Sequence, residues 1–271
     1  MLRFSRITEY QTSTTFLPLF KPVTMHLIEV NNAATKKEFL EVSARLNQHN
    51  PAYIRPLDNE VEAVFDAEKN KQFKYGTAKR WIAETDDGEV VGRIAVFTSS
   101  KYINKGTDFP TGGIGFFDCI NDQATANLLF DIAKQWLQEQ GMEAMDGPIN
   151  YGDRDKWWGL MVEGFDKDPM YGMSFNPDYY ESLFNGYGFK NYYNQYYYSM
   201  KVDDPLPARF PESHETFKGT PHPNNYFTPF YLQLAACSLK LTSSPYIAPL
   251  IWTINSSFRR VRIDHRILVR W

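Results

Sequence analysis

The sequence predicts an α/β fold in which a mixed, mostly antiparallel sheet is flanked by helices and followed by an irregular C-terminal tail. Three observations support this prediction. Short apolar runs alternate with helical patterns between residues 25 and 200, an Asp-Gly pair separates two apolar runs, and regular periodicity ends after about Pro207. With 271 residues, 43% of them hydrophobic, the chain is long enough to bury a substantial core.

The N-terminal part is predicted to contain a strand and a helix. Met25–Val30 alternates as a half-buried strand does, so the fold is expected to begin at Met25. Residues 1–24 are interpreted as a disordered N-terminal extension. Thr35 is the expected N-cap of the helix, because its hydroxyl can accept a backbone N–H. The apolar positions of this helix share one side: Phe39, Val42 and Leu46.

A polar connection that contains proline, residues 50–75, separates this helix from a predicted β-hairpin. Arg80–Thr85 and Glu89–Phe97 have the composition of strands, and they flank Asp86-Asp87-Gly88. Asp-Gly between two apolar runs is one of the strongest short-range signals for a hairpin. These two strands are therefore expected to pair antiparallel.

The centre of the chain predicts a strand, a helix and a second strand. Gly113–Ile120 has the composition of a buried strand, and Asn121 and Asp122 supply side-chain oxygens that can cap the helix after it. Gly141 is expected to end the helix, and Ala144–Asn150 forms the next strand. The helical face is apolar: Leu129, Ile132, Ala133, Trp136 and Leu137.

The next segment is a long connection followed by a helix and a strand. Between Asn150 and Asn176 lie 25 residues, where about 2 to 6 are usual between a strand and a helix. Pro177 is favoured in a first turn, so a helix is expected over Asp178–Asn185. The aromatic run Tyr192–Met200 is the last predicted strand.

The composition changes after about Pro207. No acidic residue occurs between Glu215 and Asp264, and the segment shows no helical or strand period. We interpret residues 208–271 as an irregular tail; the alternative is that this segment is a truncated or frame-altered second half. The predicted organisation is thus one α/β domain over 25–207 between two extensions.

Composition also excludes several classes of protein. The net charge of −3 gives no general affinity for nucleic acid, which needs clustered Lys and Arg. Two cysteines are too few for a disulfide framework and favour a reducing, cytoplasmic location. The five histidines lack metal-ligand spacing, so no metal site is expected. No run of eighteen apolar residues predicts a membrane span.

Three motifs add a resemblance to a known family. They are Tyr53-Ile54-Arg55-Pro56-Leu57, the run from Thr111 to Phe117 that contains Gly112, Gly113 and Gly115, and Met145-Asp146-Gly147-Pro148-Ile149-Asn150. With the predicted element order, residues 25–207 resemble the GNAT acyltransferase superfamily, and within it a bacterial group described as ceramide-synthase-like. Members of that group are taken to N-acylate a sphingoid base. Relatives continue into a second GNAT-like half, which residues 208–271 do not resemble.

The resemblance implies an activity. The chain would transfer an acyl group from an acyl-CoA or acyl-carrier thioester to an amine, with a sphingoid base as the expected lipid acceptor and no permanently bound cofactor. The expected location is the cytoplasm, with peripheral contact with the inner membrane as a further expectation. A non-catalytic ligand-binding or structural module is the alternative, and docking of the aromatic loop on a protein or bilayer is a third.

The resemblance also implies a donor site at the end of the strand Gly113–Ile120. This sequence departs from the family at two points of that site. Residues 120–125 align with the family's loop for the donor diphosphate, but both glycines of that loop are absent. Phe184 stands where the family often has a tyrosine that protonates the leaving thiolate. The residues expected to contact the donor are Phe117, Cys119, Asn121, Gln123 and Ala124. Cys119 has a simpler interpretation as a small core residue.

The strand Ala144–Asn150 and the long connection supply the remaining candidates. Asp146, Asn150 and Asp153 are the candidate catalytic residues, and the carboxylate of Asp146 or Asp153 could accept the proton of the amine. Substrate contacts are expected from an arginine that could steer a phosphate or carboxylate and from residues that could wall an apolar channel: Tyr151, Arg154, Trp157, Trp158 and Met161. The simpler alternative is that both tryptophans pack the loop onto the sheet.

Overall fold

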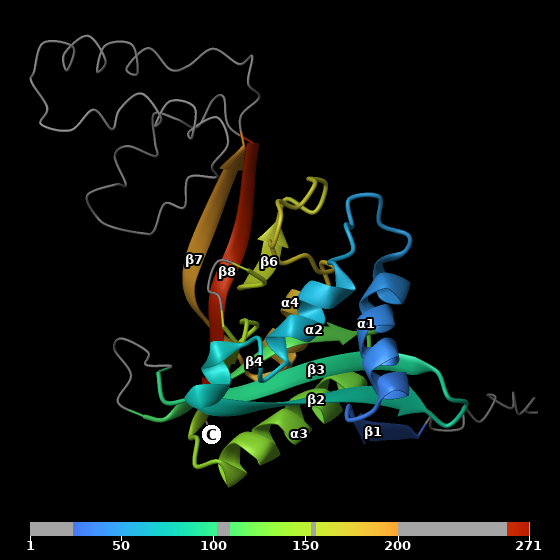
Figure 1. The fold of residues 1–271 in the computed structure, drawn as a ribbon. Coiled ribbons are helices and arrows are strands. Elements are labelled where there is room, and N and C mark those ends of the chain that lie inside the picture. Colours follow the sequence, from blue (N-terminus) through green and yellow to red (C-terminus); the bar gives the residue numbers. More distant parts are fainter. Residues whose placement is uncertain (1–23, 102–108, 153–155, 200–258, 271) are drawn as a thin grey trace, which may run out of the picture.

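A computed structural model describes residues 24–101, 109–152, 156–199 and 259–270, and structural statements below concern these residues (Figure 1). The predicted order of strand, helix, hairpin, strand, helix, strand, helix and strand is present, with further short elements between. The elements are β1 (Met25–Glu29), α1 (Ala33–Asn47), α2 (Asp58–Val64), a 3₁₀ turn (Lys71–Lys74), β2 (Gly76–Thr85), β3 (Val90–Ser99), β4 (Thr111–Cys119), α3 (Gln123–Glu139), β5 (Ala144–Gly147), β6 (Leu160–Glu163), α4 (Tyr180–Tyr187), β7 (Lys190–Ser199) and β8 (Arg259–Arg270).

One sheet organises these elements in the order β1-β2-β3-β4-β5-β8-β6, and β7 pairs with β8. The β4–β5 pair is parallel, and the other described pairs are antiparallel. The predicted fold class, a mixed and mostly antiparallel sheet with helices, is therefore confirmed.

The two faces of the sheet bury different clusters. Trp81 and Ala83 of β2 belong to the cluster that includes α3 and α4, whereas Ile82 between them belongs to the cluster that includes α1. This alternation is the period-two pattern of a strand buried on both faces. The two helical layers lie on opposite sides of the strands in Figure 1.

Side chains at the helix termini explain where α1 and α3 begin. Asn32, three residues before the predicted cap, is the N-cap of α1: its side chain accepts from the Thr35 N–H at 3.0 Å, and the Thr35 hydroxyl accepts from the Asn32 N–H. The prediction of Thr35 as N-cap was wrong because Thr35 is the other half of this capping box. Asp122 caps α3 as predicted and accepts from the Thr125 N–H at 2.7 Å, and Gly141 follows the helix with a φ of 78°.

Helix α4 begins at Tyr180, two residues later than predicted, and ends at a left-handed glycine. Gly188 has a φ of 109°, and the Phe189 N–H donates to the Phe184 carbonyl at 3.1 Å. These bonds satisfy the last carbonyls of α4 and direct the chain into β7, the predicted aromatic strand.

The C-terminal segment differs in part from the predicted irregular tail. Residues 259–270 form β8, which pairs with β5 on one side and β7 on the other. In its sequence Val261 and Ile263 alternate with charged residues, a period-two pattern that the accumulation of arginines obscured. Residues 1–23 and 200–258 lie outside the described part, so the disordered extension and the altered second half stay predictions.

Candidate functional site

Strands β4 and β5 separate after a short parallel ladder. Thr111–Gly113 pairs with Ala144–Asp146, and one further bond joins the Ile149 N–H to the Ile114 carbonyl at 2.7 Å. A Cβ atom on Gly115 would lie 1.9 Å from the Ile149 carbonyl oxygen, so only glycine allows this approach. Beyond this point a pocket lies between residues of β4 and Pro148.

A β-bulge reorients the second half of β4. Arg93 of β3 is opposite Asp118, while Ala95 is opposite Gly115, so β4 carries one extra residue, and Phe116 has a φ of 46°. Phe117 therefore stacks on Phe130 of α3 with ring centroids 4.6 Å apart. Asp118 faces the opposite side of the sheet. Without the bulge, Asp118 would share the face of Ile114 in the apolar core.

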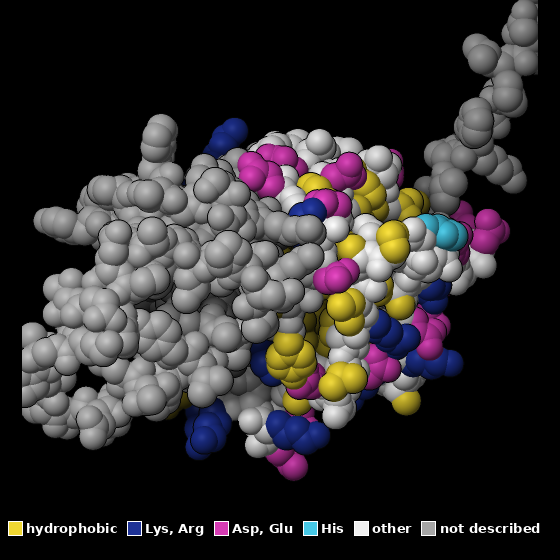
Figure 2. Space-filling model, turned by 90° about the horizontal axis from the view of Figure 1, so that it is seen from above, with side chains coloured by type: hydrophobic (Ala, Val, Ile, Leu, Met, Phe, Trp, Pro, Cys, Tyr) yellow, Lys and Arg dark blue, Asp and Glu magenta, His cyan; other side chains and the backbone are white. Residues whose placement is uncertain are grey.

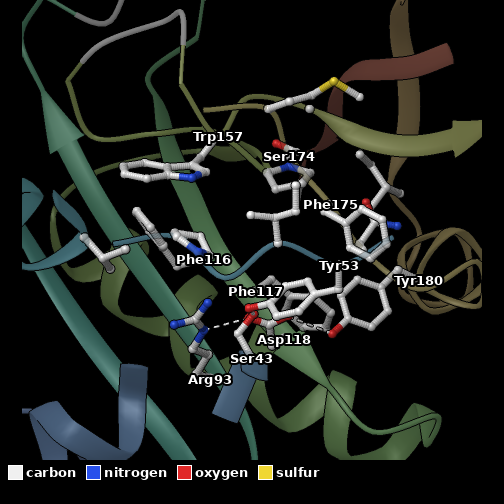
Figure 3. A pocket seen from close by; sticks show the side chains of 18 of the residues that line it. Ser43, Tyr53, Arg93, Phe116, Phe117, Asp118, Trp157, Ser174, Phe175 and Tyr180 are labelled. Carbon is white, nitrogen blue, oxygen red and sulfur yellow. Dashed lines mark hydrogen bonds and ion pairs between the residues drawn. The ribbon is translucent and has the colours of Figure 1, made fainter. Parts of the chain in front are cut away.

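The pocket has a cavity volume of about 80 Å³ and opens to solvent, and strands, helices and the long connection all contribute to its wall. In Figure 3, Trp157 and Phe116 lie on one side, Phe175 and Tyr180 on the other, and Asp118 near the base. Most of its surface is apolar or aromatic, and Asp118 is the acidic residue among its described lining residues.

Asp118 is held by two partners at the base of the pocket. The Arg93 Nε–H donates to the carboxylate at 2.6 Å, and the Tyr180 hydroxyl donates to its other oxygen at 3.1 Å. Arg93 also donates to the Phe39 carbonyl at 2.5 Å. Asp118 and Arg93 are 4% and 6% exposed, so this ion pair is buried and its geometry is fixed.

The sequence analysis missed Asp118. The only signal was one acidic residue within an apolar strand, and the pattern alone placed it in the core. A buried charge needs a partner, and the arginine in the neighbouring predicted strand could have indicated the pair.

Tyr53, from the first sequence motif, contributes a second polar group. Its hydroxyl donates to the Ser43 hydroxyl at 3.2 Å, and its ring packs against Phe175 with centroids 5.7 Å apart. Burial raises the pKa of Tyr53, so the phenol is protonated at neutral pH. The motif therefore brings a hydroxyl into the pocket.

Cys119 was predicted to contact the donor, but its backbone N–H and carbonyl are both hydrogen-bonded to tyrosine side chains at the start of α4. Its N–H donates to the Tyr180 hydroxyl at 2.9 Å, and its carbonyl accepts from the Tyr179 hydroxyl at 2.8 Å. Burial raises the pKa of Tyr179 to about 12. Burial also raises the pKa of the Cys119 thiol, which makes it an unreactive core residue.

The other predicted donor residues lie where α3 begins. Asn121 and Ala124 are exposed, whereas the Gln123 amide donates to the Leu183 carbonyl at 3.1 Å and so bridges α3 to α4. None of these three residues lines the pocket at Asp118; of the predicted donor contacts, Phe117 does.

The candidate residues in and next to the long connection line two different pockets. Trp157 lines the pocket at Asp118, so the connection faces the open end of the strand separation. Asn150, Tyr151 and Trp158 line a second pocket, which also involves Lys101. Burial raises the pKa of Tyr151 to about 12.

The remaining candidates lie away from both pockets or outside the described residues. Asp146 is fully buried on β5, and Met161 of β6 is buried against Phe175. Neither lines a described pocket. Asp153 and Arg154 lie outside the described residues.

The described residues contain no group of three or more His, Cys, Asp or Glu side chains placed to hold a metal ion. None of the described helices has the length and apolar character needed to cross a bilayer.

Comparisons with curated proteins return two relatives. The chain is 33% identical over 160 residues to the bacterial ceramide synthase of Caulobacter vibrioides (strain NA1000 / CB15N), over 57% of this chain and 40% of that protein. This confirms the resemblance that the three motifs predicted. It is 29% identical over 154 residues to Protein YghO of Escherichia coli (strain K12), over 56% of this chain and 38% of that protein. The chain thus spans about two fifths of the relatives it matches, and no family model matches it.

Similar solved structures include a tandem GNAT protein and two putative acetyltransferases. A tandem GNAT protein from the clavulanic acid biosynthesis pathway has a TM-score of 0.45 and 10% identity, over 68% of this chain and 53% of that one. A putative acetyltransferase from Acinetobacter baylyi ADP1 has a TM-score of 0.41 and 13% identity, over 69% and 89%. A putative acetyltransferase from Salmonella typhimurium with acetyl-CoA has a TM-score of 0.39 and 12% identity, over 67% and 86%.

Proposed function

We propose that this chain forms the reaction centre of an N-acyltransferase that moves an acyl group from a thioester to an amine. The observation that carries the proposal is the pocket where β4 and β5 separate, with the buried carboxylate of Asp118 at its base. The similarity to a protein named bacterial ceramide synthase supports the same class of reaction.

The proposed step is direct attack of the amine on the thioester. The amine nitrogen forms a bond to the carbonyl carbon, the C–S bond breaks, and the proton lost by nitrogen balances the proton gained by the thiolate. Asp118 would accept the amine proton, because it is the described carboxylate that faces the pocket. Arg93 and Tyr180 would position this carboxylate, and holding both reactants together would supply much of the rate.

The proposed donor is an acyl-CoA or acyl-carrier thioester, and the proposed acceptor is a long-chain amine such as a sphingoid base. An aromatic and aliphatic wall supports an acceptor or donor with an alkyl chain, because each buried methylene contributes about 0.8 kcal/mol. The name of the curated relative supports the sphingoid class.

The test is turnover of the full chain with acetyl-CoA, palmitoyl-CoA and a panel of short- and long-chain amines. We expect amide formation and free thiol in equal amounts, measured by mass spectrometry and a thiol reagent. Asp118→Asn should abolish most of both signals, while Asp131→Asn, an exposed carboxylate on α3, should not. Absence of amide from every pair, on a folded sample, would refute the proposal.

A non-catalytic binding module is the second candidate, and one observation favours it. Tyr179 and Tyr180 occupy the Cys119 backbone, and Gln123 bridges α3 to α4 where the donor diphosphate was expected. Under this proposal the pocket binds an acyl or amine ligand without releasing thiol. Calorimetric binding of palmitoyl-CoA without turnover would support it.

We also propose a cytoplasmic location with peripheral contact with a bilayer. Trp158 is buried, so the exposed apolar residues of the pocket mouth, Ile54 and neighbouring Leu57, are better candidates for that contact; each is 59% exposed. The described face in Figure 2 mixes apolar, basic and acidic side chains, and the proposed contact is insertion of the Ile54 and Leu57 side chains. Loss of liposome co-sedimentation in the Ile54→Ser, Leu57→Ser double variant would support this contact; unchanged co-sedimentation would place it elsewhere.

A further inference from the structure

Two bulky residues with left-handed backbones meet at the wall of the pocket. Among the described residues, Phe116 (φ 46°) and Trp157 (φ 47°) are the non-glycine residues with positive φ. An aromatic residue in this region is a conformational outlier that costs free energy. Such strain persists only where surrounding contacts enforce it, and it is concentrated at functional sites.

The two strained residues contact each other although 41 positions separate them. Their ring centroids are 5.3 Å apart with planes inclined by 54°, and both rings line the pocket. Figure 3 shows Trp157 above Phe116 on one side of the pocket. The strained residue of β4 and the strained residue of the long connection are therefore in contact, and we call them the Phe116–Trp157 pair.

Each residue is held in place by a different constraint. Phe116 occupies the β-bulge of β4, and Trp157 donates its backbone N–H to the Gly172 carbonyl at 2.6 Å. Behind Phe116 lie Phe39 and Phe65, with ring centroids 6.3 and 5.3 Å away. The Phe116 ring cannot retreat from a ligand without displacing this aromatic layer, so this side of the pocket is rigid.

The opposite side is aromatic as well. Phe175 and Tyr180 lie there in Figure 3, and the Tyr180 hydroxyl is held by hydrogen bonds with Asp118 and Cys119. Met173 also lines the pocket, and methionine adapts to the shape of what it contacts. A pocket with aromatic rings on two facing sides accepts a slim chain and resists a bulky one, and the Phe116–Trp157 pair would set the width on its side.

We propose that the Phe116–Trp157 pair determines chain specificity by admitting unbranched alkyl chains and excluding branched or aryl-terminated ones, with Trp157 as the specificity-determining residue. This inference rests on the proposed function, because it assigns the chain class taken by the same site. The ligand chain would lie along the flat faces of the two rings and leave its polar end at Asp118.

The experiment compares the wild-type chain with Trp157→Gly, which removes the ring and suits a positive φ, and with Trp157→Phe, which keeps an aromatic wall. Tyr171→Ala is the control, since Tyr171 belongs to the same connection, is 72% exposed and does not line the pocket. The probes are unbranched, methyl-branched and phenyl-terminated primary amines and acyl-CoAs. Each is measured by turnover and, independently, by the shift in melting temperature that it causes.

We expect Trp157→Gly to reduce the preference for unbranched over branched probes by at least about tenfold. Trp157→Phe should change the preference less, and Tyr171→Ala should not change it. An unchanged ranking in a folded Trp157→Gly sample would overturn the inference. If that variant does not fold, an unchanged ranking in Trp157→Phe together with Trp157→Leu would overturn it.

The melting-temperature measurement separates this inference from the proposed function. A wild-type chain that ranks the probes by shape but releases no thiol would refute the acyltransferase proposal and leave the specificity role of the pair intact. A chain with turnover and no ranking by shape in either assay would do the reverse.

Discussion

The two sides of the second half of β4 differ in what they face. Phe117 borders the pocket but packs its ring into an aromatic layer with Phe130, Phe184 and Phe189, where neighbouring ring centroids lie 4.6 to 5.1 Å apart. Asp118, the next residue, faces an open pocket with a buried arginine. One strand thus supplies a hydrophobic core on one side and a charged cavity on the other. The bulge at Phe116 therefore determines which face of the sheet each of these side chains occupies.

The surroundings of position 184 favour phenylalanine over tyrosine. A tyrosine expected here from the family resemblance would place its hydroxyl in an aromatic layer, and Phe184 has no exposed surface. Tyr180, one turn earlier on α4, has a hydroxyl that reaches Asp118 and Cys119. A hydroxyl at position 180 therefore has polar partners that position 184 lacks.

The largest expected effect tests the open side. Asp118→Asn should lower turnover about 10²- to 10⁴-fold, because the amide cannot accept the amine proton. The measurement is kcat/KM for amide formation, with circular dichroism to establish that the fold is retained. Turnover within a factor of three of wild type would show that the two sides of β4 do not differ in chemical role.

The filled side is tested by Phe130→Ala. Phe130 has no exposed surface, so the cavity should lower the free energy of unfolding by about 3 to 5 kcal/mol. Urea unfolding at neutral pH measures this loss. Turnover per folded molecule should stay near that of wild type; a selective loss of turnover would mean that the filled side belongs to the reaction centre.

Tyr180 connects the two sides, so its removal should give an intermediate effect. Tyr180→Phe leaves the buried Cys119 N–H without its acceptor and removes one donor to Asp118, which should cost about 1 to 3 kcal/mol of stability. Tyr179→Phe, which removes only a donor to the Cys119 carbonyl, is the matched variant. Equal unfolding midpoints for the two variants would argue against a special role for Tyr180.

The smallest expected effect concerns the start of α3. Asp122→Ala removes the N-cap and should cost about 1 kcal/mol. Hydrogen bonds from Thr125 lower the pKa of Asp122 in the folded chain, so its stabilising contribution is present above the unfolded pKa near 4 and is lost as pH falls through the folded value.

Urea unfolding of wild type and Asp122→Ala at several pH values checks this sign. The difference between them should be largest near pH 7 and decrease below pH 4. Asp122→Asn should retain most of the stability at pH 7 without the acid dependence, because asparagine also caps helices well. A difference that grows toward acid pH would contradict the assignment.

Much of the fold could be predicted because its signals are local. The hairpin at Asp87-Gly88, the cap at Asp122 and the amphipathic face of α3 each depend on a few neighbouring residues, and the structure contains all three. The tail was harder, because the strand Arg259–Arg270 becomes a strand by pairing with β5 and β7, which are distant in the sequence.

The candidate site could be predicted only in outline. The family resemblance implied a site at the end of the strand Gly113–Ile120, and the length of the connection made Trp157 a candidate, which the structure places at the pocket wall. Asp118 did not, because one extra residue in the bulge reverses which face a side chain occupies, and that shift appears only when β4 is aligned with β3.

By itself, the sequence determined the class of fold, the position of most elements and the similarity to a ceramide synthase, because periodicity, caps, turns and motifs are written in neighbouring residues. The tertiary structure alone decided that Asp118 meets Arg93 at a pocket, that Tyr179 and Tyr180 occupy the Cys119 backbone, and that Phe116 meets Trp157. The physical reason is that strand register and long-range packing fix which distant side chains share a space.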